Sequence, residues 1–275
     1  MNNAPLGIFD SGVGGLSCIG PIIRKMPAES IVFYGDCLRA PYGDRPVSEI
    51  IRFSLQIADH LAGEGCKALV IACNTISCLA IDAIREAHPD MPVIGIIEPA
   101  ARAIADAGLT EIVAASTEAT ARSGAYATAV AKLCDCKVFA QGCPQFVPII
   151  EGGKTGTPEA EAAVRFHLDR WMRQTGNIVL GCTHYPFIRA DIERVYPGVR
   201  IIDPAEALAE EVEAQLRAAG LLAEGNASYR IAASRVTDTM RLIAGKVLQE
   251  KEYTLFEHVL SESGAVNVLR KNDMG

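Results

Sequence analysis

Short runs of aliphatic and β-branched residues alternate with longer segments in which apolar residues recur every three or four positions. Such short runs are typical of buried strands, whereas the wider spacing, ending at a glycine, is typical of helices. Segments 48–65 and 159–176 show the helical spacing most clearly. The alternation predicts an α/β fold in which crossover helices join parallel strands. The expected strands are residues 6–9, 31–35, 68–72, 93–97, 112–116, 137–140, 177–181 and 199–203.

An internal repeat relates the two halves of the chain. The run ALVIACNT (68–75) resembles NIVLGCTH (177–184), and IIEPAARAIA (96–105) resembles IIDPAEALAE (201–210). The second member of each pair follows the first at a similar offset, 109 and 105 residues. Two matches in the same order and at similar spacing indicate that one ancestral half was duplicated. We therefore expect two similar halves related by a pseudo-twofold axis.

The repeat places a cysteine, Cys73 or Cys182, at the end of one strand in each half. Polar pairs suited to capping a helix follow them, Asn74-Thr75 and Thr183-His184. The positive end of a helix dipole favours a thiolate, which is a base. Most cysteines are only small buried packing residues, but their symmetry favours a chemical role for these two. The other cysteines lack this symmetry and are expected to pack: Cys18, Cys37, Cys66, Cys78, Cys134, Cys136 and Cys143.

Two acid–base groups on opposite faces of one ligand are what inversion of a stereocentre requires. Open α/β sheets bind ligands at the carboxyl ends of their strands, so facing halves would bring Cys73 and Cys182 to one cleft. A cysteine hydrolase is the competing interpretation, with His184 as the base beside Cys182. That alternative leaves Cys73 unexplained.

Three other features are open to more than one interpretation. The loop DSGVGG (10–15) would let backbone N–H groups meet a carboxylate, but it lacks the third glycine of a dinucleotide-binding motif. Asp10 could orient an ammonium group, tune a thiol or only cap a turn. The segment APYG (40–43) is either an ordinary turn or a rigid loop beside the substrate. Glu151, next to two glycines, is by itself a loop carboxylate.

Composition narrows the function classes. The formal net charge is −7, with 26 Lys and Arg against 33 Asp and Glu, so a broad basic surface for nucleic acid is not expected. No run is apolar enough to span a membrane and no leader is apparent, which predicts a cytoplasmic protein. The nine cysteines are irregularly spaced, and CDC (134–136) is accompanied by no CxxC pair and no HxxxH, so neither a disulfide framework nor a metal site is expected.

Five motifs occur together in one order: FDSGVGG (9–15), GDCLRAPYG (35–43), ACNT (72–75), TEATARSGAY (117–126) and GCTHYP (181–186). With them, residues 6–210 resemble the glutamate racemases of the aspartate/glutamate racemase family. The resemblance implies interconversion of L- and D-glutamate without pyridoxal phosphate or metal, supplying D-glutamate for peptidoglycan. Other interpretations are a racemase for aspartate or another amino acid, and a non-catalytic binding protein such as a topoisomerase inhibitor.

The resemblance also implies roles for individual residues. Cys73 would act as base on one enantiomer and Cys182 on the other. Asp10 would assist Cys73, whereas His184, supported by Glu151, would assist Cys182. The substrate would be held by Asp10, Ser11, Pro41, Tyr42, Gly43, Asn74, Thr75, Thr117, Thr120, Thr183 and His184.

The family architecture implies two α/β domains that close over a buried cleft, with the end of the chain returning to the first domain. We accordingly expect a discontinuous first domain, 1–97 plus 208–275, and a second domain, 98–207. A homodimer is the usual state of the family. The charged tail after about Phe256 has no predicted place.

Overall fold

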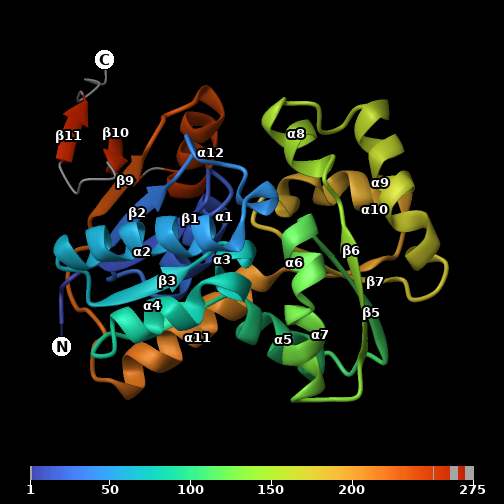
Figure 1. Cartoon of the computed structure of the whole chain (residues 1–275), viewed down its shortest axis with the longest axis horizontal. Helices are drawn as coiled ribbons and strands as arrows, with labels where there is room; N and C mark the ends of the chain where they lie inside the picture. Colours follow the sequence, from blue (N-terminus) through green and yellow to red (C-terminus); the bar gives the residue numbers. More distant parts are fainter. Residues whose placement is uncertain (1, 250, 261–265, 270–275) are drawn as a thin grey trace.

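The computed structural model describes residues 2–249, 251–260 and 266–269. Within them, the chain forms two lobes side by side, each built on its own sheet (Figure 1). The strands of the first sheet are β1 (Leu6–Asp10), β2 (Ile31–Gly35), β3 (Ala68–Ile71), β4 (Val93–Gly95), β9 (Tyr229–Ala233), β10 (Tyr253–Leu260) and β11 (Val266–Leu269). Those of the second are β5 (Glu111–Ser116), β6 (Lys137–Gly142), β7 (Asn177–Gly181) and β8 (Arg200–Ile202).

The strand order repeats between the lobes. The first sheet contains the order β2-β1-β3-β4 and the second has β6-β5-β7-β8, in both cases with parallel neighbours. Each strand of one set thus has a counterpart in the other, and β3 corresponds to β7. The eight strands and the α/β class expected from the sequence are confirmed.

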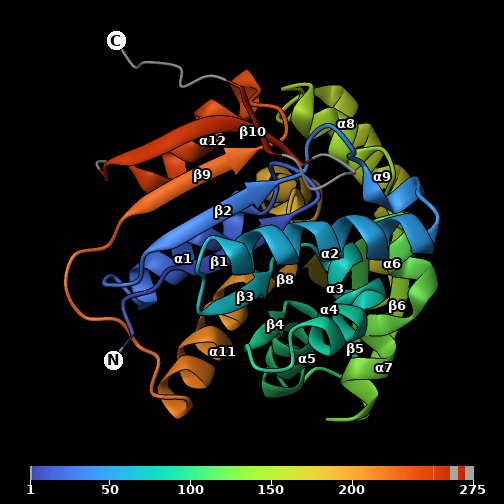
Figure 2. The same cartoon turned by 60° about the vertical axis from the view of Figure 1, so that its left-hand side comes forward.

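Three strands of the first sheet were not predicted. Strands β9 and β10 add in parallel beyond β2 (Figure 2). Strand β11 pairs antiparallel with β10. Threonine, glutamate and histidine interrupt the apolar residues of β10, so it lacks a clear strand signal. Part of the charged tail therefore has a place in the sheet. Its residues 261–265 and 270–275 lie outside the described residues.

Helices cover both faces of each sheet. On the first sheet, α1 (Leu16–Lys25), α11 (Pro204–Ala218) and α12 (Asp238–Leu248) pack on one face, and α2 (Val47–Gly63), α3 (Asn74–Leu79) and α4 (Ile81–Ala87) on the other. On the second, α8 (Phe146–Glu151), α9 (Pro158–Met172), η2 (Tyr185–Ile188) and α10 (Arg189–Val195) oppose α5 (Ile97–Asp106) and α7 (Ala125–Ala131). The short elements α6 (Glu118–Ser123) and η1 (Tyr42–Asp44) lie between the lobes.

Two helices cross between the lobes. Helix α5 follows β4 of the first sheet but packs into the core of the second, where Ala100 and Ile104 lie with Ile112. Helix α11 follows β8 of the second sheet but packs into the core of the first, through Leu208 and Val212. These helices carry the second pair of repeated sequences, and they contact each other. The exact division at 97/98 and 207/208 stays a prediction.

Buried positions alternate along the central strands. In β3, Ala68 and Val70 face one core cluster, whereas Leu69 and Ile71 face the other. Because both faces of the strand are packed in a core, the position of its carboxyl end is fixed. No helix in the described ranges combines the length and apolar character needed to cross a membrane.

Candidate active site

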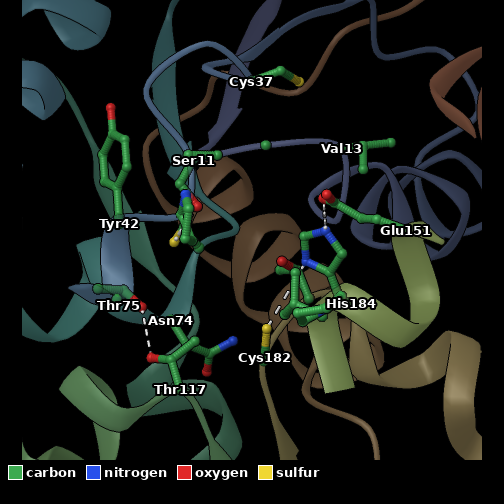
Figure 3. A pocket seen from close by; sticks show the side chains of 18 of the residues that line it. Ser11, Val13, Cys37, Tyr42, Asn74, Thr75, Thr117, Glu151, Cys182 and His184 are labelled. Carbon is green, nitrogen blue, oxygen red and sulfur yellow. Dashed lines mark hydrogen bonds and ion pairs between the residues drawn. The ribbon is translucent and has the colours of Figure 1, made fainter. Parts of the chain in front are cut away.

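A cavity of about 620 Å³ lies between the lobes, at the carboxyl ends of strands from both sheets. Figure 3 shows Ser11, Tyr42 and Thr75 on one side of it and Cys182 and His184 on the other. The lining includes these residues expected from the sequence: Ser11, Pro41, Tyr42, Gly43, Cys73, Asn74, Thr75, Thr117, Glu151, Cys182, Thr183 and His184. Asp10 and Thr120 are not part of the lining, and lie directly behind it, bonded to residues that are.

Cys73 lies on the wall formed by the first lobe. It precedes α3, is only 5% exposed, and its thiol donates a hydrogen bond to Ser11 Oγ at 3.5 Å. Burial, followed by the negative charge of Asp10, raises the pKa of this thiol, although hydrogen bonds from Ser11 and the Ile76 N–H oppose the shift. These shifts favour the neutral thiol of Cys73, whereas the helix terminus was expected to favour the thiolate. Helix α3 has only six residues, and desolvation outweighs it.

Cys182 lies on the wall formed by the second lobe, 7% exposed, beside a charged pair. Its sulfur is 4.0 Å from His184 Nδ1, and His184 Nε2 is 2.9 Å from Glu151 Oε1. Burial by itself lowers the pKa of His184, but the interactions with Cys182 and Glu151 outweigh it and raise the pKa to about 10. The hydrogen bond from His184 lowers the pKa of Glu151. His184 therefore carries a positive charge at neutral pH, next to the thiol.

Asp10 joins the two lobes. Its side chain is fully buried, accepts the Gly12 N–H at 2.8 Å, and accepts the Thr183 hydroxyl from the other lobe at 3.0 Å. Burial raises its pKa, and the charge of His184 partly opposes this shift. Of the alternatives considered for Asp10, the hydrogen bond from the Gly12 N–H corresponds to the turn cap. The Gly12 N–H is consequently used within the loop and is not free for a ligand carboxylate.

Gly14 allows the same loop to approach the second lobe. A Cβ atom at this position would lie 2.5 Å from both His184 Nδ1 and Thr183 Oγ1. Only glycine leaves room for those two side chains. Gly14 is thus needed for close packing between the lobes.

Hydroxyl and amide groups form the floor of the cavity. Thr75 Oγ1 is 3.0 Å from Thr117 Oγ1, and Thr120 bonds to both threonines. The Asn74 carbonyl accepts the Tyr126 hydroxyl at 2.7 Å, but its buried amide nitrogen has no hydrogen-bond partner among the described residues. In Figure 3 that nitrogen points toward Cys182. A carboxylate in the cavity would supply the acceptor that this donor lacks.

The APYG segment forms a loop that leads into η1. The Tyr42 hydroxyl donates to Asp36 Oδ2 at 2.5 Å, and Figure 3 shows it directed away from the cavity centre. Burial and the charge of Asp36 raise the pKa of this phenol. Gly43 lies against Thr117, where a Cβ would be 3.2 Å from the threonine Cβ. The loop therefore contributes surface and backbone rather than the phenol group.

Several lining residues were missed. Glu118, Arg235, Thr237 and Thr239 border the cavity. Strand β9 was not predicted, so nothing placed the residues that follow it. Cys37 and Cys143, expected only to pack, also line the cavity, and burial raises the pKa of Cys37 to about 12.

Two copies of one α/β frame, with a thiol on each wall of a shared cavity, define an amino-acid racemase. Residues 22–212 match the model of the Asp/Glu/Hydantoin racemase family, and the chain belongs to that family. The resemblance inferred from the motifs is confirmed.

Individual relatives cover most of the chain. It is 42% identical to a glutamate racemase of Thermus thermophilus over 219 residues, 80% of this chain and 82% of the relative. It is 37% identical to a glutamate racemase of Desulforudis audaxviator over 261 residues, 90% and 95% of the two chains. The crystal structure of a Francisella tularensis glutamate racemase in complex with D-glutamate superposes with a TM-score of 0.87, at 31% identity, and covers 96% of this chain and 100% of that one.

Proposed function

We propose that this protein interconverts L- and D-glutamate by moving one proton at the α-carbon between two cysteines, and that it supplies D-glutamate for peptidoglycan. One observation carries the proposal: Cys73 and Cys182, from equivalent positions of two lobes, line a single cavity. The identity to glutamate racemases over most of the chain supports glutamate as the substrate.

The chemistry follows from the two walls. The Cα–H of an amino acid is a very weak acid, so the pocket must stabilise the carbanion as it forms. One thiolate takes the proton from one face, and the thiol opposite gives a proton to the other face. The buried, neutral thiol of Cys73 suits the role of proton donor. On the other wall, the positive charge of His184 lies beside the Cys182 sulfur, 4.0 Å from His184 Nδ1.

The remaining polar groups suit an amino acid with two carboxylates. The unpaired amide nitrogen of Asn74 and the hydroxyls of Ser11 and Thr75 can donate hydrogen bonds to carboxylate oxygens, whereas the hydroxyls of Thr117 and Thr183 already donate to Thr120 and Asp10. Asp10 acts on Cys73 through its charge, and Glu151 acts on Cys182 through His184. Both are positioning residues in this scheme.

Circular dichroism of the purified protein with L-glutamate, without any added cofactor, tests the proposal. The ellipticity should decay to zero because the two enantiomers have the same free energy in water. D-Glutamate should give the mirror-image decay. A stable signal with both hands would contradict racemase activity, and a faster decay with L-aspartate would contradict the choice of glutamate.

The assembly and location belong to the same proposal. We expect a cytoplasmic homodimer, as the family resemblance implies. Light scattering on the purified protein measures the oligomeric state, and fractionation of cells measures the location. A monomer at micromolar concentration would contradict the dimer without affecting the assignment of the reaction.

A further inference from the structure

Arg235 is a cation at the mouth of the cavity. It lies in the loop that follows β9, its side chain is exposed, and it belongs to the cavity lining. The described lining contains no other Lys or Arg, but it contains three carboxylates, Asp44, Glu118 and Glu151. Arg235 is thus the guanidinium that an anionic ligand would meet as it enters.

The guanidinium of Arg235 is free to bind a ligand. Among the described residues, its side chain makes no ion pair and no hydrogen bond, whereas Glu118 pairs with Arg122 and Glu151 with His184. An unpaired guanidinium presents a planar set of N–H donors that matches a carboxylate. It is available without the loss of an existing salt bridge.

The backbone on both sides of Arg235 is held in place. The Ser234 N–H donates to the Gly35 carbonyl at 2.9 Å, and the Ser234 hydroxyl accepts the Leu38 N–H at 2.8 Å. The Val236 N–H donates to Glu257 Oε1 of β10 at 2.9 Å. Strands β9 and β10 therefore hold the backbone of Arg235 at the cavity, while its side chain remains exposed.

The positive charge of Arg235 is opposite to that of the proposed substrate. The chain has a net charge of −7, and glutamate is itself a net anion at neutral pH. Of the carboxylates that line the cavity, Glu118 and Glu151 are paired with Arg122 and His184, which leaves the charge of Asp44 to repel such a substrate. We infer that Arg235 attracts and holds the dicarboxylate substrate at the cavity mouth, and so raises the rate of productive binding. This inference rests on the proposed function, and it assigns recognition of substrate charge to the loop after β9.

The test compares Arg235→Gln with Arg241→Gln, which removes the same charge from an exposed position on α12 outside the cavity lining. For Arg235→Gln we expect kcat/KM for glutamate to fall about five- to tenfold at low ionic strength, with kcat unchanged. Added salt should reduce the ratio of kcat/KM between the wild-type protein and Arg235→Gln, because it screens the attraction that only the wild type has. Arg235→Lys should retain most of the activity, and Arg241→Gln should match the wild type.

Equal kcat/KM and equal salt dependence for Arg235→Gln and Arg241→Gln would overturn the inference, as would a fall in kcat with KM unchanged. Calorimetric titration with D-glutamate separates this failure from failure of the proposed function, because it needs no turnover. Weaker binding by Arg235→Gln than by Arg241→Gln supports the inference even in a protein that racemises nothing. A wild-type protein that neither binds nor racemises glutamate would overturn both.

Discussion

The two halves share a frame but not an environment. Strands β3 and β7 hold equivalent places in the repeated strand order, and each delivers a cysteine to the cavity. Around Cys73 lie Ser11 and the buried charge of Asp10, which with burial keeps the thiol neutral. Around Cys182 lies the pair of His184 and Glu151.

Duplication thus sets where the two thiols lie, whereas later differences set which charged groups lie beside each one. The reaction itself limits how this asymmetry can be observed. Because the enantiomers have equal free energy, kcat/KM must be equal for L- and D-glutamate in any variant. Racemisation rates alone cannot distinguish the two walls. Hydrogen exchange on a single enantiomer can.

The largest effect is expected from removal of either thiol. Cys73→Ala and Cys182→Ala should each lower racemisation about a thousandfold or more, since each removes one of two acid–base groups. In deuterated water, each variant should still exchange the Cα–H of one enantiomer, and the two variants should exchange opposite hands. NMR of L- and D-glutamate measures this exchange, with far-ultraviolet circular dichroism as the check of folding. Loss of exchange on both hands in both variants would contradict separate bases.

A smaller effect should come from the pair behind Cys182. The Glu151 carboxylate stabilises the imidazolium of His184, whose pKa is about 10. In Glu151→Gln this stabilisation is lost, the pKa of His184 falls, and the imidazolium loses its proton at a lower pH. The alkaline limb of the kcat/KM profile should move to lower pH, with about a tenfold loss of activity at its former optimum.

Glu159→Gln is the matched control for Glu151→Gln. Glu159 forms a surface ion pair with Lys154 and lies outside the cavity lining. Its pH profile should superpose on that of the wild type. An unchanged alkaline limb in Glu151→Gln would break the proposed contrast between the two walls.

Gly14 tests how tightly the first lobe is packed against the Cys182 wall. In Gly14→Ala the new methyl group would lie 2.5 Å from His184 Nδ1 and Thr183 Oγ1, so both side chains must move. We expect about a tenfold loss of kcat/KM, since small displacements of catalytic groups are costly. Gly12→Ala, whose Cβ would have no neighbour closer than 3.9 Å, should lose less. Equal losses in steady-state assays of the two variants would refute this steric explanation.

Periodicity and the repeat were sufficient to predict the eight core strands and the shared position of Cys73 and Cys182. Both signals come from buried apolar runs, which the sequence displays directly. Strand β10 was not predicted because Thr254, Glu257 and His258 interrupt its apolar residues. Arg235 was missed because β9, the strand before it, was not predicted either. The state of Cys73 also could not be read, because desolvation depends on the tertiary packing around it.

The extension of the first sheet also creates the smallest expected effect, and one confined to that half. His258 of β10 stacks on His60 of α2, with ring centroids 4.6 Å apart. Burial lowers the pKa of both, and for His60 the neighbouring His258 lowers it further; the nearby charges of Glu64 and Arg230 act on His60 in opposite directions.

As the pH falls below about 6.5, the unfolded chain takes up protons on these residues before the folded protein does, so the free energy of unfolding decreases. His60→Phe keeps an aromatic ring but removes one charge, so its free energy of unfolding should decrease less between pH 7.5 and pH 5.5 in urea titrations. If its free energy of unfolding decreases as much as that of the wild type, the stacked histidines do not make the stability of the protein depend on pH.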